Sequence, residues 1–111
     1  MATLPSGDVL PLESLITATP HGIASRLLAR TSGGNVTLFA FDAGEELTEH
    51  TSPFDAIVVT LDGALALTIG GRAVQTAAQT VALMPAHVPH AVRAVAPSRM
   101  LLILLRESAS Q

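Results

Sequence analysis

The chain has 111 residues, of which 49% are hydrophobic and 14% are charged, so it can bury one core and is not a disordered segment. Its net charge is −3, its six basic residues are scattered arginines, and it has neither Tyr nor Trp, which argues against a cationic, aromatic groove for nucleic acid. It has no Cys, which excludes disulfides, thiolate catalysis and zinc sites built from Cys.

The N-terminal segment and the longest apolar run bear on location. The opening MATLPSGDVLPLES has no positive charge and no apolar segment of the kind that a signal peptide needs. The longest fully apolar run, residues 100–105, is far too short to span a bilayer. We therefore expect a soluble cytoplasmic protein with no membrane partner, folded as one domain over residues 1–111.

The first part of the chain predicts an arm followed by two strands. Residues 1–20 are rich in Pro, Thr and Ser and are expected to form an extended N-terminal arm. Residues 23–30 fit a short helix or a strand, and the Gly-Gly-Asn turn signal at 33–35 favours the strand. Residues 36–41, VTLFAF, are β-branched and aromatic and predict a strand. Residues 42–50, DAGEELTEH, are expected to form an acidic loop.

The middle of the chain predicts a β-meander. The dipeptides Asp-Gly at 62–63 and Gly-Gly at 70–71 are strong tight-turn signals between runs of strand length. The expected strands are 56–61, 64–69 and 72–76.

The last part predicts three more strands. Residues 80–85 end at a proline, and residues 90–95 alternate His90, Val92 and Ala94 on one face. Residues 99–106 are apolar on both faces, which predicts a strand buried on both sides, in a sandwich core or against a second subunit. A helix over 99–106 also fits the periodicity. Eight or nine short strands with closely spaced turns indicate an all-β sandwich or barrel.

The stretch MPAHVPH, residues 84–90, holds two histidines that cannot share a helical face. Each proline lacks a donor N–H and pushes the residue before it out of the α region. His87 therefore belongs to a turn, and His90 begins the next strand. His87 is expected in the turn because His visits positive φ more than most residues; a third imidazole above a site is the alternative.

Two segments resemble the motifs of the cupin superfamily. The segment GEELTEHTSPFDAIVVTLDG fits the frame G(X)5HXH(X)3–4E(X)6G, with matches at Gly44, His50 and Gly63. The segment QTVALMPAHVPHAVRA fits G(X)5PXG(X)2H(X)3N, with matches at Pro85 and His90. The resemblance covers residues 36–105 and implies a small single-domain cupin of the RmlC-like type: an all-β jelly-roll β-sandwich barrel.

The departures from these motifs bear on a metal site. Metal-binding cupins use two His and one Glu of the first motif and one His of the second. Here Ser52 and Ala56 replace one His and the Glu, so the resemblance leaves only His50 and His90 as ligands. Asp55 could supply a carboxylate if a bulge turned it inward. A divalent metal (Zn, Fe, Mn or Ni) is therefore considered and not favoured, because metal sites usually have three protein ligands.

We expect a small molecule to bind in the barrel beside His50, Ser52 and His90. One alternative is a metal-dependent dioxygenase, isomerase or cyclase with an incomplete site, and another is a structural dimerising module. A Ser-His nucleophile is not expected, because Ser52 and His50 lie about 7 Å apart along a strand. The apolar terminal strand and the cupin resemblance both favour a homodimer. The sequence assigns no role to His21 or Arg26.

Overall fold

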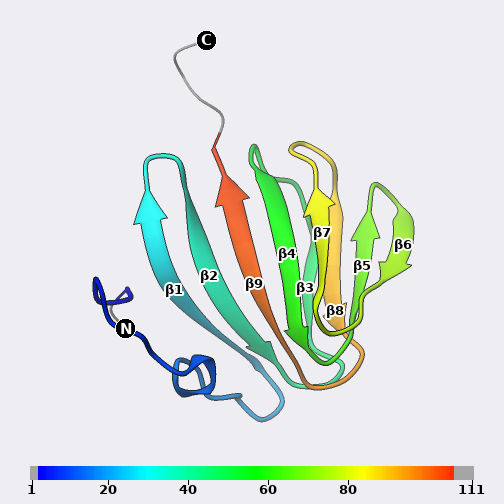
Figure 1. Cartoon of the computed structure of the whole chain (residues 1–111). Helices are drawn as coiled ribbons and strands as arrows, with labels where there is room; N and C mark the ends of the chain where they lie inside the picture. Colours follow the sequence, from blue (N-terminus) through cyan, green and yellow to red (C-terminus); the bar gives the residue numbers. More distant parts are fainter. Residues whose placement is uncertain (1–2, 107–111) are drawn as a thin grey trace.

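The computed structural model describes residues 3–106, so the two ends of the expected domain, residues 1–2 and 107–111, lie outside the described residues. The described part contains one short 3₁₀ helix followed by antiparallel strands (Figure 1). Their bounds are η1 Leu12–Ser14, β1 Ile23–Thr31, β2 Gly34–Phe41, β3 Glu46–His50, β4 Asp55–Asp62, β5 Leu65–Ile69, β6 Arg72–Gln75, β7 Thr80–Met84, β8 His90–Ala94 and β9 Ser98–Leu105.

The strands form two sheets that face each other in a jelly-roll sandwich. One sheet has five strands in the order β1-β2-β9-β4-β7, and the other has four in the order β3-β8-β5-β6. Figure 1 shows β9 in the middle of the larger sheet, between β2 and β4. The expected all-β jelly roll is confirmed, and the helical alternative for residues 99–106 is wrong.

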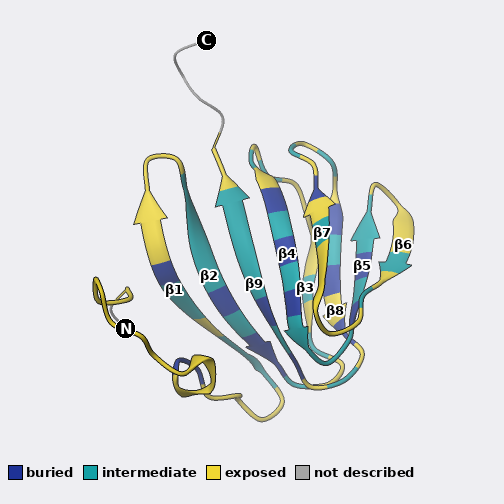
Figure 2. Ribbon diagram, in the orientation of Figure 1, coloured by how far each residue is buried: buried dark blue, intermediate teal, exposed yellow. Residues whose placement is uncertain are grey.

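The main core lies between the two sheets. Because side chains alternate along a strand, each strand gives every second residue to this layer. Figure 2 shows the resulting bands of buried residues across the strands. The core is aliphatic apart from one aromatic ring, as the composition requires. Its buried members are Phe41, Ala56, Val58, Leu65, Leu67, Met84, Val92, Ala94 and Met100.

The N-terminal arm covers part of the outer face of the larger sheet. Leu15 and Ile16 follow η1 and are 6% and 8% exposed, packed with Leu28, Leu38 and Ala40 of β1 and β2. Arg26 on β1 fixes this contact, because its Nη1 donates to the Leu15 carbonyl over 3.1 Å. The arm is thus part of the fold over these residues.

One strand was missed by the sequence patterns. Residues 42–50 were expected to form a loop, and that expectation is wrong for β3, which pairs with β8. The segment is acidic and mostly exposed, with only Leu47 packed against the core. Pairing with a buried neighbour, which local propensity cannot register, makes it a strand.

The turn dipeptides of the meander are confirmed. Gly63, Gly70 and Gly71 all have positive φ, between 58° and 81°, as tight turns require. Asp62 accepts hydrogen bonds from the backbone N–H and Nε of Arg99, which ties this turn to β9. Over residues 3–106 the structure has no helix long and apolar enough to cross a membrane.

Candidate functional site

His50 and His90 face each other on two paired strands. The antiparallel register of β3 and β8 sets His50 opposite His90, after an irregularity that follows Leu47. The ring centroids are 4.4 Å apart, and the ring planes are inclined by 71° in an edge-to-face arrangement. The two histidines are far apart in sequence, so strand pairing alone brings them together.

The backbone fixes the same tautomer in both rings. His50 Nδ1 lies 2.8 Å from the Thr48 carbonyl oxygen, and His90 Nδ1 lies 3.1 Å from the Val88 carbonyl oxygen. A carbonyl oxygen can only accept, so Nδ1 carries the proton and donates in each ring. In the neutral rings, Nε2 then holds the lone pair that can accept a hydrogen bond from a ligand or bind a metal.

The two histidines differ in burial. His90 is 4% exposed and shares the inward face of β8 with Val92 and Ala94. His50 is exposed, because β3 is the edge strand of its sheet and His50 is its last residue. The pair therefore extends from the buried inner face of β8 to the exposed end of β3.

Ser52 lies in the loop that follows His50 and is half-buried. Its Oγ accepts a hydrogen bond from the Phe54 N–H over 3.1 Å, which closes a local turn. Its carbonyl accepts from the His87 N–H over 2.8 Å and so joins the β3–β4 loop to the β7–β8 loop. Because Oγ is the acceptor in its bond, the hydroxyl proton can still be donated to a ligand.

Asp55 does not lie with the histidine pair. It starts β4 one residue before the buried Ala56, so the strand alternation sets it on the outer face. Its Oδ1 accepts a hydrogen bond from the Ala86 N–H over 2.8 Å. The carboxylate therefore holds the β7–β8 loop. In the part of the chain that the structure describes, no group of three His, Cys, Asp or Glu side chains could hold a metal ion.

His87 is an exposed turn residue with φ 66°, which confirms the expected left-handed conformation. It lines a hollow of about 400 Å³ between the two loops, together with Asp55 and Arg106. The Arg106 guanidinium lies 5.1 Å from the centre of the Phe54 ring, a cation–π contact. No sequence pattern indicates this hollow, because it depends on where the end of β9 meets the loops.

Two residues without a predicted role have structural contacts far along the chain. The His21 backbone N–H donates to Asp42 Oδ2 over 2.7 Å, while its side chain is 96% exposed. Backbone hydrogen bonds from His21 and Ala43 lower the pKa of Asp42 below its ordinary value of 3.8. Arg26 lies on β1 and holds the arm through Leu15. Neither residue is near the histidine pair in the strand order.

Two facing antiparallel sheets in jelly-roll order, with a histidine pair at one end, define the class of small β-sandwich barrels to which cupins belong. Comparison with protein families matches residues 37–105 to the cupin domain of the Cupin_2 family. The chain belongs to the cupin family, as its two motifs predicted.

Solved structures agree with this assignment. A conserved protein of unknown function from Streptococcus pyogenes is 31% identical, with 98% of each chain covered and a TM-score of 0.88. A cupin superfamily protein from Desulfitobacterium hafniense is 30% identical, with 96% of this chain and 97% of the other covered and a TM-score of 0.86. A cupin 2 conserved barrel domain protein from Leptotrichia buccalis is 32% identical over 86% of this chain and 46% of its own, with a TM-score of 0.81. No curated protein matches the chain.

Proposed function

We propose that this cupin binds a small molecule at the mouth formed by His50, Ser52 and His90. The observation that carries the proposal is the tautomer of the pair. Both Nδ1–H groups donate hydrogen bonds to backbone carbonyls, which leaves both Nε2 atoms for a ligand. Binding sites commonly combine apolar walls with a few convergent polar groups. Here Val92 and Ala94 share the inward face of β8 with His90, and the polar groups would come from the two histidines and the Ser52 hydroxyl.

The chemistry of these groups suggests the class of ligand. Neutral Nε2 atoms accept hydrogen bonds from hydroxyl or amine groups, and a protonated ring donates to a carboxylate. The Ser52 hydroxyl can donate or accept. A small polar organic molecule with hydroxyl or carboxylate groups satisfies all three side chains.

A screen of small hydroxy acids and sugar acids by thermal shift, followed by calorimetry, tests this proposal. Binding should weaken at least tenfold in His50→Ala and in His90→Ala. His21→Ala is the matched control, since it removes an imidazole that is 96% exposed and that lies beside Asp42, 4.0 Å from Oδ2, rather than beside His50 or His90. Compounds that bind His50→Ala as tightly as the wild type would place the ligand elsewhere and defeat the proposal.

A metal-dependent cupin enzyme is the alternative, favoured by the same two Nε2 atoms. A dioxygenase, isomerase or cyclase would need Zn, Fe, Mn or Ni held by His50 and His90, with water or substrate completing the coordination. Asp55 could join only if its carboxylate left the Ala86 N–H. Metal analysis of untagged protein separates the two: one equivalent of metal that is lost in His50→Ala supports the enzyme, and substoichiometric metal that ignores the change counts against it.

We also propose that the protein works as a cytoplasmic homodimer without nucleic-acid partners. The support for a dimer is the state of β9, whose outward side chains from Leu101 to Leu105 are at most half-buried by the single chain although every one is aliphatic. The six scattered arginines give no basic surface for nucleic acid. Sedimentation of the purified protein tests the dimer, and cell fractionation tests the location.

A further inference from the structure

A small hollow lies at the end of the larger sheet, where the β1–β2 hairpin meets the end of β9. Its volume is about 40 Å³, and the lining residues that bear on its chemistry are Arg30, Asn35, Phe54, Leu104 and Arg106. None of the three residues of the proposed ligand mouth lines this hollow. It therefore offers a second place for a bound molecule, apart from the mouth.

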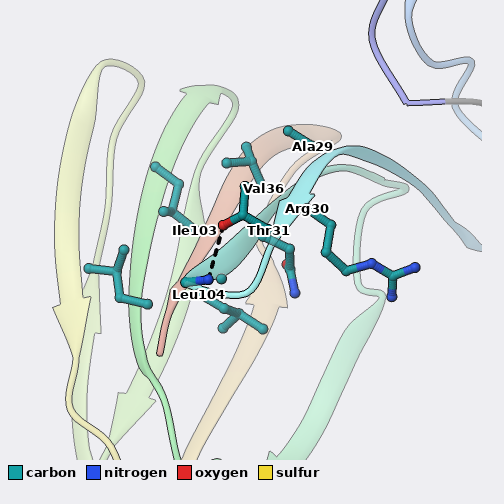
Figure 3. A pocket seen from close by; sticks show the side chains of 10 residues that line it. Ala29, Arg30, Thr31, Val36, Ile103 and Leu104 are labelled. Carbon is teal, nitrogen blue, oxygen red and sulfur yellow. Dashed lines mark hydrogen bonds between the residues drawn. The ribbon is translucent and has the colours of Figure 1, made fainter. Parts of the chain in front are cut away.

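Strand register brings the lining residues together. Arg30 on β1 lies opposite Asn35 on β2, and Asn35 lies opposite Leu104 on β9. Residues that pair across an antiparallel sheet share a face, and residues two apart on one strand do as well, so Arg106 follows Leu104 on that face. Figure 3 shows Arg30 projecting away from Ile103, which lies on the opposite face. Two arginines that are far apart in the sequence are thus brought to one hollow.

The hairpin is held close to the end of β9. Thr31 Oγ1 accepts a hydrogen bond from the Gly33 N–H over 3.0 Å and closes the turn, as the dashed line in Figure 3 marks. The Gly33 carbonyl accepts from the Arg106 N–H over 2.8 Å. A Cβ at Gly34 would meet the backbone of Leu104, so the glycine permits this close approach. The backbone beside both arginines is therefore fixed.

Neither arginine is neutralised by the described part of the chain. Among residues 3–106, no carboxylate lies within ion-pair distance of Arg30 or Arg106, and no group accepts a hydrogen bond from either guanidinium. Arg99 shows the contrast, because its guanidinium pairs with Asp62. The net charge of the whole chain is −3, so acidic residues are not scarce. Two like charges at one hollow repel each other, and an anion between them would relieve that repulsion.

Phe54 and Asn35 complete the surroundings of the two charges. The Arg106 guanidinium carbon lies 5.1 Å from the centre of the Phe54 ring, a cation–π contact that holds the side chain and leaves its N–H groups for a ligand. Asn35 is half-buried and adds a side-chain amide that can donate a hydrogen bond. The hollow thus combines two cations, a neutral donor and the apolar surface of Phe54 and Leu104.

The size of the hollow and the shape of its donors select a carboxylate group. At about 40 Å³ the hollow is little larger than the roughly 30 Å³ that one water molecule occupies in the liquid, so it accommodates only the head group of a ligand. A guanidinium presents parallel N–H groups that match the two oxygens of a planar carboxylate. A phosphate group, with four oxygens around one atom, is bulkier and not planar.

We propose that Arg30, Arg106 and Asn35 bind the carboxylate group of a small organic acid, at a site separate from the histidine mouth. The carboxylate lies between the two guanidinium groups and accepts hydrogen bonds from them and from the amide. The carbon atoms next to the carboxylate contact Phe54 and Leu104, so a short aliphatic acid is the class of ligand that fits. The site goes beyond the proposed function, because it requires neither His50 nor His90.

Titration of the isotope-labelled full chain with propionate at constant ionic strength, followed by NMR, tests the site. The side-chain Nε–H signals of Arg30 and Arg106 should shift and saturate, with a Kd on the order of 1 mM for so small a ligand. Propionamide has nearly the same shape without the charge and should leave both signals in place. Signals of the wild type that do not move with propionate would overturn the proposal.

Glutamine variants assign the binding to the two arginines. Arg30→Gln and Arg106→Gln should each raise the Kd for propionate at least tenfold. Arg72→Gln is the matched control, since it removes an exposed guanidinium of β6 in the other sheet and should bind as the wild type does. Circular dichroism verifies that each variant is folded. A Kd that neither Arg30→Gln nor Arg106→Gln changes contradicts the assignment.

Two further arms separate this site from other sources of binding. Chloride at the same concentration should not give a saturable shift; if it does, the hollow takes an adventitious ion only and the carboxylate site is wrong. His50→Ala should bind propionate as tightly as the wild type. Loss of binding in His50→Ala would move the carboxylate to the mouth and overturn the separate site, whereas a mouth that binds no ligand leaves the result at the two arginines unchanged.

Discussion

At the scale of single residues, two left-handed positions link the sequence to the family motif. Gln79 and His87 stand where the second cupin motif has glycine, and their φ angles are 68° and 66°. Both residues thus adopt the left-handed conformation that glycine adopts most easily. For a residue with a Cβ this conformation costs about 1 kcal/mol of stability. Backbone contacts hold both positions: Gln79 N–H donates to Thr60 and His87 N–H donates to Ser52.

The His87 position gives a direct stability prediction. His87→Gly should be about 1 kcal/mol more stable than His87→Ala, because glycine has no Cβ to strain at φ 66°. The side chain is exposed, so its own contacts contribute little to the comparison. Urea denaturation of the two variants measures the difference. Equal stability, or a more stable alanine variant, would show that the turn relaxes out of the left-handed region.

Asp42 predicts a pH dependence. Its pKa is lowered chiefly by the His21 backbone N–H and then by that of Ala43, so folding favours the charged carboxylate. The stabilisation is fully present above the ordinary pKa of 3.8 and is lost as the pH falls through the lower folded value. The Tm advantage of wild type over Asp42→Asn should therefore be constant from pH 7 to about 5 and shrink below about 4. An advantage that stays constant down to pH 2 would contradict this origin.

At the scale of elements, the sequence predicted strands where turn dipeptides and apolar alternation were strong. The meander and β8 follow from Asp62-Gly63, Gly70-Gly71 and the alternation of His90, Val92 and Ala94. The sequence did not predict β3, because its acidic residues are not typical of a strand. This segment is a strand because it pairs with β8. Local patterns report a residue's own preference and do not report a neighbour that is far away in the chain.

The candidate site was predictable only in part for the same reason. The motif spacing identified His50 and His90 as partners, and the register of β3 and β8 sets them opposite each other. The bond from Asp55 to the Ala86 N–H, and the two Nδ1 bonds to Thr48 and Val88, depend on the course of two loops. No spacing rule contains that information.

The Asp62-Gly63 turn leaves no room for a side chain at Gly63. A Cβ at Gly63 would meet Ser98 Oγ and the Pro97 carbonyl, in a conformation with φ 79°. Ser98 is buried and hydrogen-bonds to both backbone groups of Ala64, so it cannot move without loss. Gly63→Ala should therefore lower the free energy of unfolding by at least about 2 kcal/mol.

Gly71 provides the matched control for this prediction. Its φ is 81°, but a Cβ there would meet no atom within 4 Å. Gly71→Ala should cost only the backbone term of about 1 kcal/mol. Chemical denaturation of both variants separates steric conflict from backbone strain. Equal losses would mean that the Ser98 contact adds nothing.

At the scale of the whole molecule, the larger sheet has one face inside the sandwich and one face that the chain covers unevenly. The arm covers part of β1 and β2, and the outward aliphatic side chains of β9, β4 and β7 are left for the partner in the proposed homodimer. This arrangement explains why residues 100–105 are apolar on both faces of β9. The inner residues complete the core. Of the outer residues, Leu101 packs beside the arm, and Ile103 borders a separate hollow of about 260 Å³ beside the β1–β2 hairpin.

If the arm is a structural layer, its two buried residues must contribute to global stability. Leu15→Ala should destabilise the protein by about 2–3 kcal/mol, because it removes a side chain that is 6% exposed from a cluster with Leu28 and Leu38. Leu10→Ala, at a leucine of the same arm that is 41% exposed, should cost less than about 1 kcal/mol. Thermal and urea unfolding measure both. Losing the same small amount at both positions would mean that the arm detaches before the sandwich unfolds, and the outer face would then be uncovered over β2 as well.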